Sequence, residues 1–351
     1  MSAPIMPAVL TEAGLEIAAC DVFVPRSQLL SGVSIAPGDV AVVSGSLVEG
    51  MGNEFSDIDV HVICRTRPRR NAFDLSQHHR ILTASRSIVR ADEAPNEPDV
   101  FLVHSPVAGT GIKIDVEYDT YDDMARMKTR ISEIYDYARR NLVLLTKGMD
   151  VREKILPHRL LSGIAIGGDP SAVFDANDNR RFRYLLYRWK ASDFMMLLDC
   201  LGTFRKGEYL RAADIARENL LLQAGAFVAL LGGLNTRRKW VPVYLELLGS
   251  NYTEIIAEFL ACYPGPRSAE PSEARAYVLR VVDLIDAIFS ASIPLLDRMG
   301  GVPVGDEALE LLRLDRDRAT TGTPYAEMEF EYRARAYCDL KTSTADLFVR
   351  T

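Results

Sequence analysis

Residues 42–63 read VVSGSLVEGMGNEFSDIDVHVI, and the architecture of the N-terminal third can be worked out from this stretch. It starts within a β-branched run, 39–44, that is typical of a buried strand. A glycine-rich turn with a short helix is expected next. From Asp57 onward polar and apolar residues alternate with a period of two, which predicts a second strand with one face on the core. Asp57 and Asp59 then share a face of that strand, with their carboxylates close together.

The flanking sequence extends this pattern to a small mixed α/β unit. Further strands are expected at 99–104 (DVFLVH) and 111–118 (GIKIDVEY), and a helix is expected over 7–20. After about residue 118 the spacing of apolar residues becomes helical. Helices are predicted at 121–141, 150–161, 179–202, 209–231, 237–248, 253–262 and 273–298, with breaks at glycine and proline.

These elements predict an α+β fold with two domains. An N-terminal α/β domain with a mixed sheet is expected over residues 1–140, followed by a helical bundle domain over 141–351. A length of 351 residues agrees with two cores. The hydrophobic content of 48% and the charged content of 25% exclude a disordered or disulfide-stapled chain.

Charge and cysteine usage narrow the classes of partner. The 41 basic and 48 acidic residues leave a net charge of -7, so a nucleic-acid duplex is not an expected partner. The five cysteines are scattered without a CxxC pair, which is typical of a reducing compartment. The N-terminus has no basic leader region, and the most apolar stretch, 220–234, is shorter than the roughly 20 residues of a membrane span. A cytoplasmic location without a membrane partner is expected, and the sequence leaves the oligomeric state open.

The residue types around the two central strands suit a phosphate group and a hard cation. Gly45 has no side chain, so backbone N–H groups at this turn can approach an anion, and the Ser46 hydroxyl can donate to it. Two like charges at Asp57 and Asp59 are costly unless a cation lies between them. Asp115 offers a third carboxylate if its strand lies beside the first. Oxygen ligands of this kind suit Mg²⁺, and a pair of ions about 3.5–4 Å apart could clamp a reacting phosphate.

This pattern resembles the DNA polymerase beta-like nucleotidyltransferase superfamily. The signature of that superfamily is Gly-Ser after an apolar residue, a spacer of roughly ten residues, Asp-x-Asp on a strand, and a distant third acid. The matching residues here are Gly45, Ser46, Asp57, Asp59 and Asp115. With its helical C-terminal half, the chain is most similar to the aminoglycoside and lincosamide nucleotidyltransferases. These enzymes move a nucleoside monophosphate from an NTP onto a hydroxyl of a small molecule.

The resemblance implies a role for each matching residue. Ser46 and the backbone at Gly45 would hold the β- and γ-phosphates, and Asp57 and Asp59 would bind the catalytic Mg²⁺ ions. Asp115 would be a metal ligand or the general base that accepts the proton of the acceptor hydroxyl. ATP is the expected NTP, with AMP transferred and pyrophosphate released.

Two further residues near this motif are left open by the sequence. Glu117 shares a strand face with Asp115 and is the competing candidate for the base. His61 continues the parity of Asp57 and Asp59, and it is expected to flank the cleft rather than to bind a ligand.

Cations of the helical half are candidates for contacts with the triphosphate. In this family type such a cation often comes from the helical domain, which favours Arg188 and Lys190 in the segment 180–190 (RRFRYLLYRWK). Lys239 lies in NTRRKW, 235–240, at a predicted helix start where N–H groups favour anions. The structural alternative for the first segment is a solvated basic face with tyrosine and Trp189 in the core. For the second segment it is exposed cations beside an N-cap.

The same motif is compatible with other functions. A cyclic-dinucleotide or oligonucleotide synthase of the same superfamily would carry the same motif, and RNA end polymerisation and protein AMPylation are further possibilities. A catalytically silent nucleotide-binding module would keep the fold. The clustered acids Asp57, Asp59 and Asp115 argue against an inactive module, because an inactive protein has no reason to retain mutually repelling charges.

Overall fold

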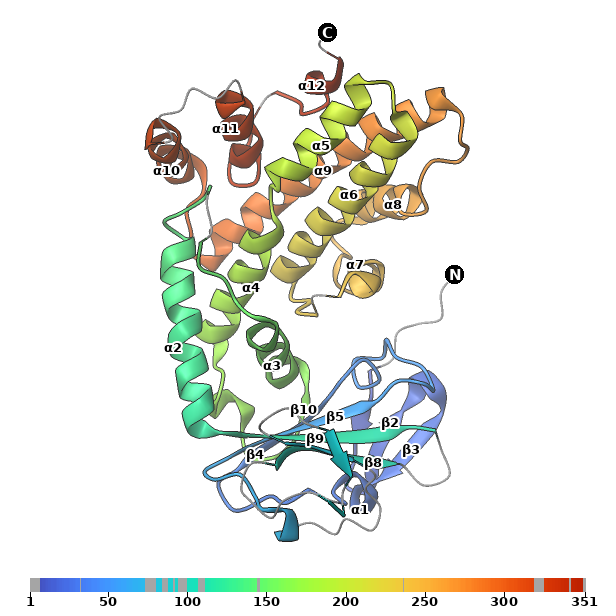
Figure 1. Cartoon of the computed structure of the whole chain (residues 1–351), viewed down its shortest axis with the longest axis vertical. Coiled ribbons are helices and arrows are strands. Elements are labelled where there is room, and N and C mark those ends of the chain that lie inside the picture. Colours follow the sequence, from blue (N-terminus) through green and yellow to red (C-terminus); the bar gives the residue numbers. More distant parts are fainter. Residues whose placement is uncertain are drawn as a thin grey trace. The chain divides into compact units, whose positions relative to one another are not determined.

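The computed structural model of the chain describes residues 7–31, 33–72, 80–83, 88–90, 92–93, 100–106, 111–143, 146–235, 237–318, 325–340 and 342–349. The fold is mixed α+β, with a mixed sheet in the N-terminal part and a helical C-terminal region (Figure 1). Packing divides the chain into two compact units, each made of two segments. The first unit is Met1–Ile131 with Val151–Asn179, and the second is Ser132–Asp150 with Arg180–Thr351. The boundary expected at residue 140 falls in a segment that packs with the second unit.

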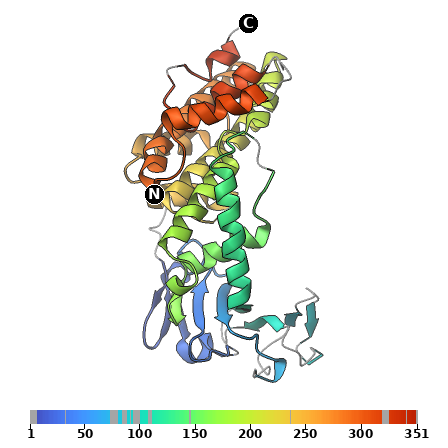
Figure 2. The same cartoon turned by 90° about the vertical axis from the view of Figure 1, so that its left-hand side faces the viewer.

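The first unit is built on a seven-stranded sheet with the order β10-β4-β5-β9-β8-β6-β7. The strands are β4 (Val40–Ser44), β5 (Ile58–Cys64), β6 (Arg80–Thr83), β7 (Ile88–Arg90), β8 (Val100–Pro106), β9 (Lys113–Thr120) and β10 (Ile164–Gly167). The pairing of β5 with β9 is parallel, and the other pairings among the described strands of this sheet are antiparallel. Figure 2 shows β6, β7 and β8, in teal, at one edge of this sheet.

Alternation along β5 and β9 separates a hydrophobic face of the sheet from a polar one. Ile58, Val60 and Val62 of β5 and Ile114, Val116 and Tyr118 of β9 join one buried cluster. Because successive side chains of a strand point to opposite faces, the intervening Asp59, His61, Asp115, Glu117 and Asp119 lie on the other face. Helix α3 (Val151–Ser162) packs against β4 and lies over the sheet (Figure 1). The period-two pattern read from the sequence is confirmed.

The N-terminal helix expected over 7–20 is wrong. This region forms β1 (Val9–Leu10), β2 (Gly14–Ile17) and the short 3-10 helix η1 (Ala18–Cys20), followed by β3 (Val22–Pro25) and α1 (Arg26–Leu29). Strands β1, β2 and β3 form a separate antiparallel sheet. Leu15 and Ile17 are buried with Glu16 exposed between them, which is the period of a strand. A Cβ on Gly14 would stand 2.2 Å from the carbonyl oxygen of Val24, so this close strand pairing depends on glycine.

Two smaller expectations also change. Residues 46–50 form turns instead of the short helix expected after Gly45. Asp57 lies one residue before β5 instead of within the strand. Only four residues separate Gly45 from Gly50, which is too short a segment for a stable helix. The carbonyl oxygen of Ser46 accepts hydrogen bonds from the N–H groups of Met51 and Gly52.

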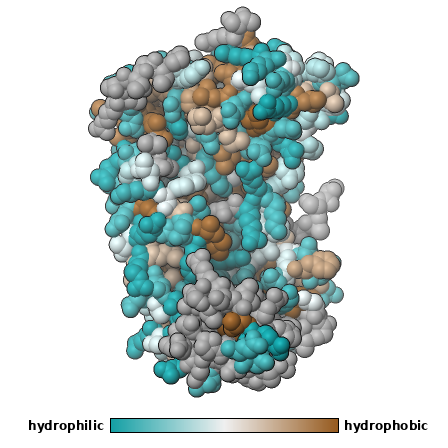
Figure 3. All heavy atoms as spheres, viewed as in Figure 1, coloured by the Kyte–Doolittle hydropathy of each residue, from teal (hydrophilic) through white to brown (hydrophobic). Residues whose placement is uncertain are grey.

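Helices dominate the remainder of the chain. They are α2 (Tyr121–Ala138), α4 (Ala176–Lys190), α5 (Phe194–Arg205), α6 (Tyr209–Leu231), α7 (Val241–Leu248), α8 (Thr253–Cys262), α9 (Pro271–Met299), α10 (Gly305–Arg318), α11 (Ala326–Arg335) and α12 (Asp346–Val349), with 3-10 turns η2 (Arg70–Ala72), η4 (Pro170–Ala172) and η5 (Arg238–Trp240). In the second unit α6 and α9 pack along each other (Figure 1). None of the helices that the structure describes is long and apolar enough to cross a membrane. In Figure 3 the described residues on the face in view are mostly hydrophilic, with hydrophobic side chains in small groups.

The single helix predicted over 179–202 is two helices. Ser192 adopts a left-handed conformation with φ 53°, which ends α4. Asp193 then caps α5 by accepting a hydrogen bond from the backbone N–H of Met196 at 3.2 Å. The helices expected at 209–231 and 253–262 are confirmed with the predicted bounds as α6 and α8.

Candidate functional site

Three acids meet at one end of the β5–β9 pair. The parallel register places Asp59 directly beside Asp115, and exposed Asp57 lies just before β5. Burial raises the pKa of Asp59 to about 6, Arg159 partly offsets the rise, and the charges of Asp115 and Asp57 add to it. The structure therefore brings Asp57 and Asp115 close enough to Asp59 to disfavour its charge.

The predicted glycine turn lies against these acids. Gly45 directly follows β4 and has φ 113°, in the left-handed region that favours glycine. A Cβ at this position would stand 2.8 Å from Oδ2 of Asp59 and 3.2 Å from the carbonyl oxygen of Asp57. The turn is held by the carbonyl oxygen of Ser46, which accepts hydrogen bonds from the N–H groups of Met51 at 2.8 Å and Gly52 at 2.7 Å. Gly45 and Ser46 are thus brought together with the acids, and a larger residue at position 45 would displace them.

Two arginines of α3 reach the polar face of the sheet, and the sequence analysis missed both. Arg159 Nη2 lies 2.9 Å from Oδ2 of Asp59. Arg152 Nη2 contacts both carboxylate oxygens of buried Asp119, at 2.5 and 2.6 Å, and Arg152 Nη1 also pairs with Glu117. The signal that could have found them is their spacing, because residues i and i+7 share one face of a helix.

Two histidines are buried near the acids, His61 on β5 and His158 on α3. His61 is not at the edge of a cleft, because its side chain is only 6% exposed, with Nδ1 3.7 Å from Oε2 of Glu117. Burial lowers the pKa of His61 to about 3, and Arg159 adds to that effect, so the ring is neutral at pH 7. Nε2 of His158 lies 3.0 Å from Oε1 of Glu49. The acids of the polar face therefore lie near two buried imidazoles as well as the arginines of α3.

The structure separates the two candidates for the general base by their neighbours. Glu117 is engaged by Arg152 and faces His61. Asp115 stands in register with Asp59, at the end of the strand pair that lies near Gly45. Asp115 is thus the acid of β9 that is grouped with Asp57 and Asp59.

The donor set fits Mg²⁺ bound together with a phosphate. Within the described ranges, no group of three or more His, Cys, Asp or Glu side chains is arranged to hold a metal ion by itself. Mg²⁺ usually takes one or two protein carboxylates and completes its shell with waters and substrate phosphates. Asp59 and Asp115 offer two such carboxylates. Burial raises the pKa of Asp59 and the neighbouring acids add to the rise, and a cation would relieve the repulsion among them.

The three predicted cations of the helical half all belong to the second unit. Arg188 is buried, and its Nη2 donates to the carbonyl oxygen of Asn141 at 2.8 Å. The structural alternative for this segment is correct for the tyrosines, since Tyr184 and Tyr187 are buried, but it is wrong for Trp189, which is 41% exposed. Lys190 ends α4, and Nζ of Lys239 lies 4.6 Å from the centre of a ring of Trp240. Their role toward a nucleotide stays a prediction.

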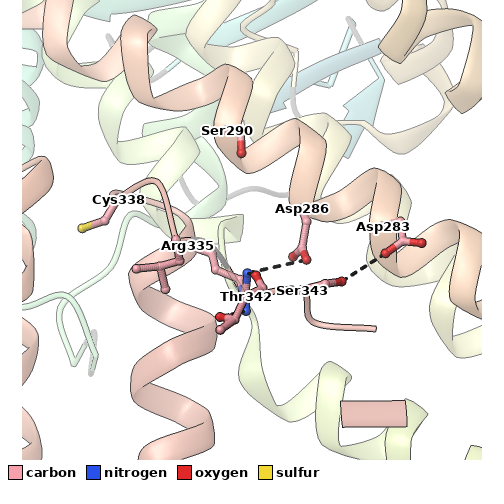
Figure 4. A pocket seen from close by; sticks show the side chains of 8 residues that line it. Asp283, Asp286, Ser290, Arg335, Cys338, Thr342 and Ser343 are labelled. Atoms are coloured by element: carbon pink, nitrogen blue, oxygen red, sulfur yellow. Dashed lines mark hydrogen bonds and ion pairs between the residues drawn. The ribbon is translucent and has the colours of Figure 1, made fainter. Parts of the chain in front are cut away.

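The second unit has a small cavity of about 190 Å³ next to α9 (Figure 4). Asp286 accepts hydrogen bonds from the backbone N–H of Thr344 at 2.8 Å and from its hydroxyl at 2.7 Å. Ser343 donates to Asp283 at 3.2 Å, and Arg335 donates to the hydroxyl of Thr342 at 2.7 Å. These contacts fasten the segment 342–349 to the helices, so the polar lining of this cavity has a structural use.

Comparisons with known proteins give a distant structural similarity. No protein-family model matches the chain, and no curated protein matches its sequence. The chain resembles the crystal structure of a nucleotidyltransferase-like protein from Exiguobacterium sibiricum 255-15, with a TM-score of 0.36 and 13% sequence identity. The similarity covers 83% of this chain and 85% of that chain. At this level it does not determine the reaction, which has to follow from the side chains of the site.

Proposed function

We propose that the chain is a nucleotidyltransferase that moves a nucleoside monophosphate from an NTP to a hydroxyl of a small molecule. The observation that carries this proposal is the position of Asp59 and Asp115, in register on parallel strands and next to the glycine turn at Gly45. An acid pair beside a turn with accessible backbone N–H groups suits a metal-bound triphosphate. The proposed NTP is ATP, with AMP as the transferred group.

In this proposal the chain's residues bind the nucleotide and accept one proton. The backbone at Gly45 and the Ser46 hydroxyl bind the β- and γ-phosphates. Asp57, Asp59 and Asp115 would hold Mg²⁺, which when bound supplies positive charge to the reacting and leaving phosphate oxygens. Asp115 accepts the proton of the acceptor hydroxyl as its oxygen attacks the α-phosphorus. The bond from the α-phosphorus to the bridging oxygen breaks, and pyrophosphate leaves with that oxygen.

Glu117 has a different proposed role. Its ion pair with Arg152 supports a function in holding α3 against β9. Glu117→Gln should therefore lower the stability of the first unit, and the rate of pyrophosphate release should change little.

The test is pyrophosphate release from each of the four NTPs, with Mg²⁺ and a panel of small hydroxyl compounds. The expected result is release that depends on one class of acceptor and is abolished in Asp59→Asn and Asp115→Asn. Asp59→Asn should unfold at the same temperature as the wild type or higher, because a neutral amide avoids the burial that disfavours the Asp59 charge. The matched control is Asp122→Asn, an exposed acid in the first turn of α2, which should retain activity.

Two outcomes would contradict the proposal. Full activity in either site variant would exclude the acid pair from the chemistry. Nucleotide products formed from NTPs alone, without an acceptor, would instead favour a cyclic-dinucleotide or oligonucleotide synthase.

A further inference from the structure

Arg159 occupies the carboxylate that a metal ion would need. Its guanidinium reaches from α3 to Asp59, with 2.9 Å between Nη2 and Oδ2. The side chain of Arg159 is 14% exposed and that of Asp59 is 26% exposed, so water screens this pair only in part. A metal ion arriving at Asp59 would meet a positive charge already in place.

The second terminal nitrogen of Arg159 is left without a hydrogen bond. Nη1 is buried and has no hydrogen-bond partner among the residues that the structure describes. It lies 3.6 Å from the point where a Cβ on Gly45 would stand, so it borders the turn where we place the phosphates. A buried donor without an acceptor is unfavourable, and an anion at this turn would relieve it.

A guanidinium is well suited to such an exchange. It stays charged at all relevant pH values, and its planar fork matches the oxygens of a phosphate as well as those of a carboxylate. Arg152 offers the contrast, because it is bound by both oxygens of Asp119 and also by Glu117. Among the described residues Arg159 has one ion pair to break, whereas Arg152 is held by two acids.

We propose that Arg159 is a positioning residue that holds Asp59 in the empty site and transfers to the triphosphate when the nucleotide binds. This inference rests on the proposed function. In the empty protein, Arg159 and a metal ion exclude each other on Asp59. The phosphates of the nucleotide give the guanidinium a second anion, so metal and nucleotide bind together and the metal alone binds weakly.

The test measures binding, so it needs no acceptor. Mn²⁺ serves as the metal probe, followed by its paramagnetic resonance signal, and α,β-methylene-ATP serves as a nucleotide that cannot transfer its AMP. In Arg159→Gln, Mn²⁺ alone should bind roughly tenfold more tightly, because a competing charged contact is gone. The same variant should bind the nucleotide with Mn²⁺ roughly tenfold more weakly, because a charge-assisted contact to phosphate is lost. Working near pH 8.5 keeps Asp59 ionised, well above its pKa of about 6.

Two comparison variants separate the parts of the effect. Arg159→Lys keeps the positive charge but not the fork, so Mn²⁺ should stay weakly bound while nucleotide affinity falls. Arg126→Gln removes an exposed arginine of the same unit, which pairs with Asp123 on α2, and should change neither affinity. Circular dichroism melting of each variant verifies folding.

The outcomes are distinguishable. Opposite shifts in the two affinities of Arg159→Gln support the inference. Unchanged Mn²⁺ affinity, or equal weakening of both affinities, overturns it and leaves the proposed function standing. A wild-type protein that binds neither Mn²⁺ nor the nucleotide contradicts the proposed function, and the inference with it.

Discussion

Burial disfavours the charge of the Asp59 carboxylate and raises its pKa to about 6. It nonetheless lies beside Asp115 and close to Asp57, which disfavour that charge further. Folding gains nothing from such a group, and a cation at the site would remove the conflict. A local conflict of this kind is typical of a functional position.

Gly45 links the turn to these acids, and its replacement gives the first prediction. Gly45→Ala should lower the free energy of unfolding by about 1–2 kcal/mol through its positive φ alone, and by more because the new Cβ would stand 2.8 Å from Oδ2 of Asp59. It should also weaken nucleotide binding, measured by titration calorimetry. Urea unfolding gives the stability.

The chain offers a matched control for Gly45→Ala. Gly38 has φ 90°, yet a Cβ there would meet no atom within 4 Å. Gly38→Ala should therefore show the backbone strain without any loss of nucleotide affinity. Equal nucleotide binding in both variants would mean that the turn at Gly45 does not shape the site.

His61 gives a prediction on pH. Burial lowers its pKa to about 3 in the folded state, whereas in the unfolded state the pKa is about 6.5. Between these pH values the unfolded state binds a proton at His61 and the folded state does not. The contribution of His61 to stability is complete above about pH 6.5 and is lost as the pH falls toward 3, by up to about 1.4 kcal/mol per pH unit. Asp59, with its raised pKa, has the opposite effect: stability falls as the pH rises from the unfolded-state pKa of Asp59 to about 6. Asp59 is present in both the wild type and the His61 variant, so its effect is common to both.

The measurement is urea unfolding of the wild type and of His61→Gln between about pH 4 and pH 7. The free energy of unfolding of the variant should fall less steeply on acidification. Parallel pH profiles would show that His61 is protonated equally in the folded and unfolded states.

At the scale of helices and strands, local pattern predicted those elements whose environment is uniform along their length. The alternation from Asp57 gave β5, and the amphipathic spacing gave α6 and α8. The prediction for 7–20 was wrong because Ala and Leu there are compatible with a helix, whereas the strand at Gly14–Ile17 depends on pairing with residues outside this segment, Val22–Pro25. The break at Ser192 was not predicted, because a single left-handed residue followed by one capping residue hardly changes the composition of the segment.

The candidate site divides in the same way. The Gly-Ser turn and the acids could be found because they belong to two short stretches of sequence. The spacing of Arg152 and Arg159 indicates only that they share one face of a helix, and it does not indicate their partners Asp119 and Asp59, which lie far away in the chain. Whether an arginine of an amphipathic helix meets water or a carboxylate depends on that packing.

The fastening of the C-terminal segment gives a prediction for an element. Asp286→Ala removes both hydrogen bonds to Thr344 and should cost about 1–3 kcal/mol of stability. The segment 342–349 should then be cut faster by a protease under native conditions. Asp283→Ala is the control, because it removes one longer contact to Ser343, of 3.2 Å. Equal cutting rates in the two variants would contradict a specific role for Asp286.

At the scale of the whole molecule, each packing unit is assembled from two separate parts of the chain. The first unit takes α3 and β10 from beyond residue 150, and α3 supplies Arg152 to buried Asp119. A buried acid that loses its partner costs about 3–5 kcal/mol. The first unit is therefore complete only when the chain has passed through residues 151–179, which follow a segment of the second unit.

A truncation tests this arrangement. The fragment 1–140 should not fold, because it lacks α3, whereas the fragment 1–179 contains both parts of the first unit. Circular dichroism during heating should show a cooperative transition for the longer fragment and none for the shorter. A cooperative transition in the fragment 1–140 would show that the first 140 residues are a domain by themselves.

The parallel pairing of β5 with β9 also limits how this protein can vary. Sliding one strand by a single residue would turn the acids into the core and the core residues out into water, since side chains alternate along both strands. Burial of the hydrophobic residues on the opposite face of β5 and β9 thus fixes the register that aligns the carboxylates. Mutational drift can remove an acid by replacing it, but it cannot shift the acids out of line without unfolding the sheet.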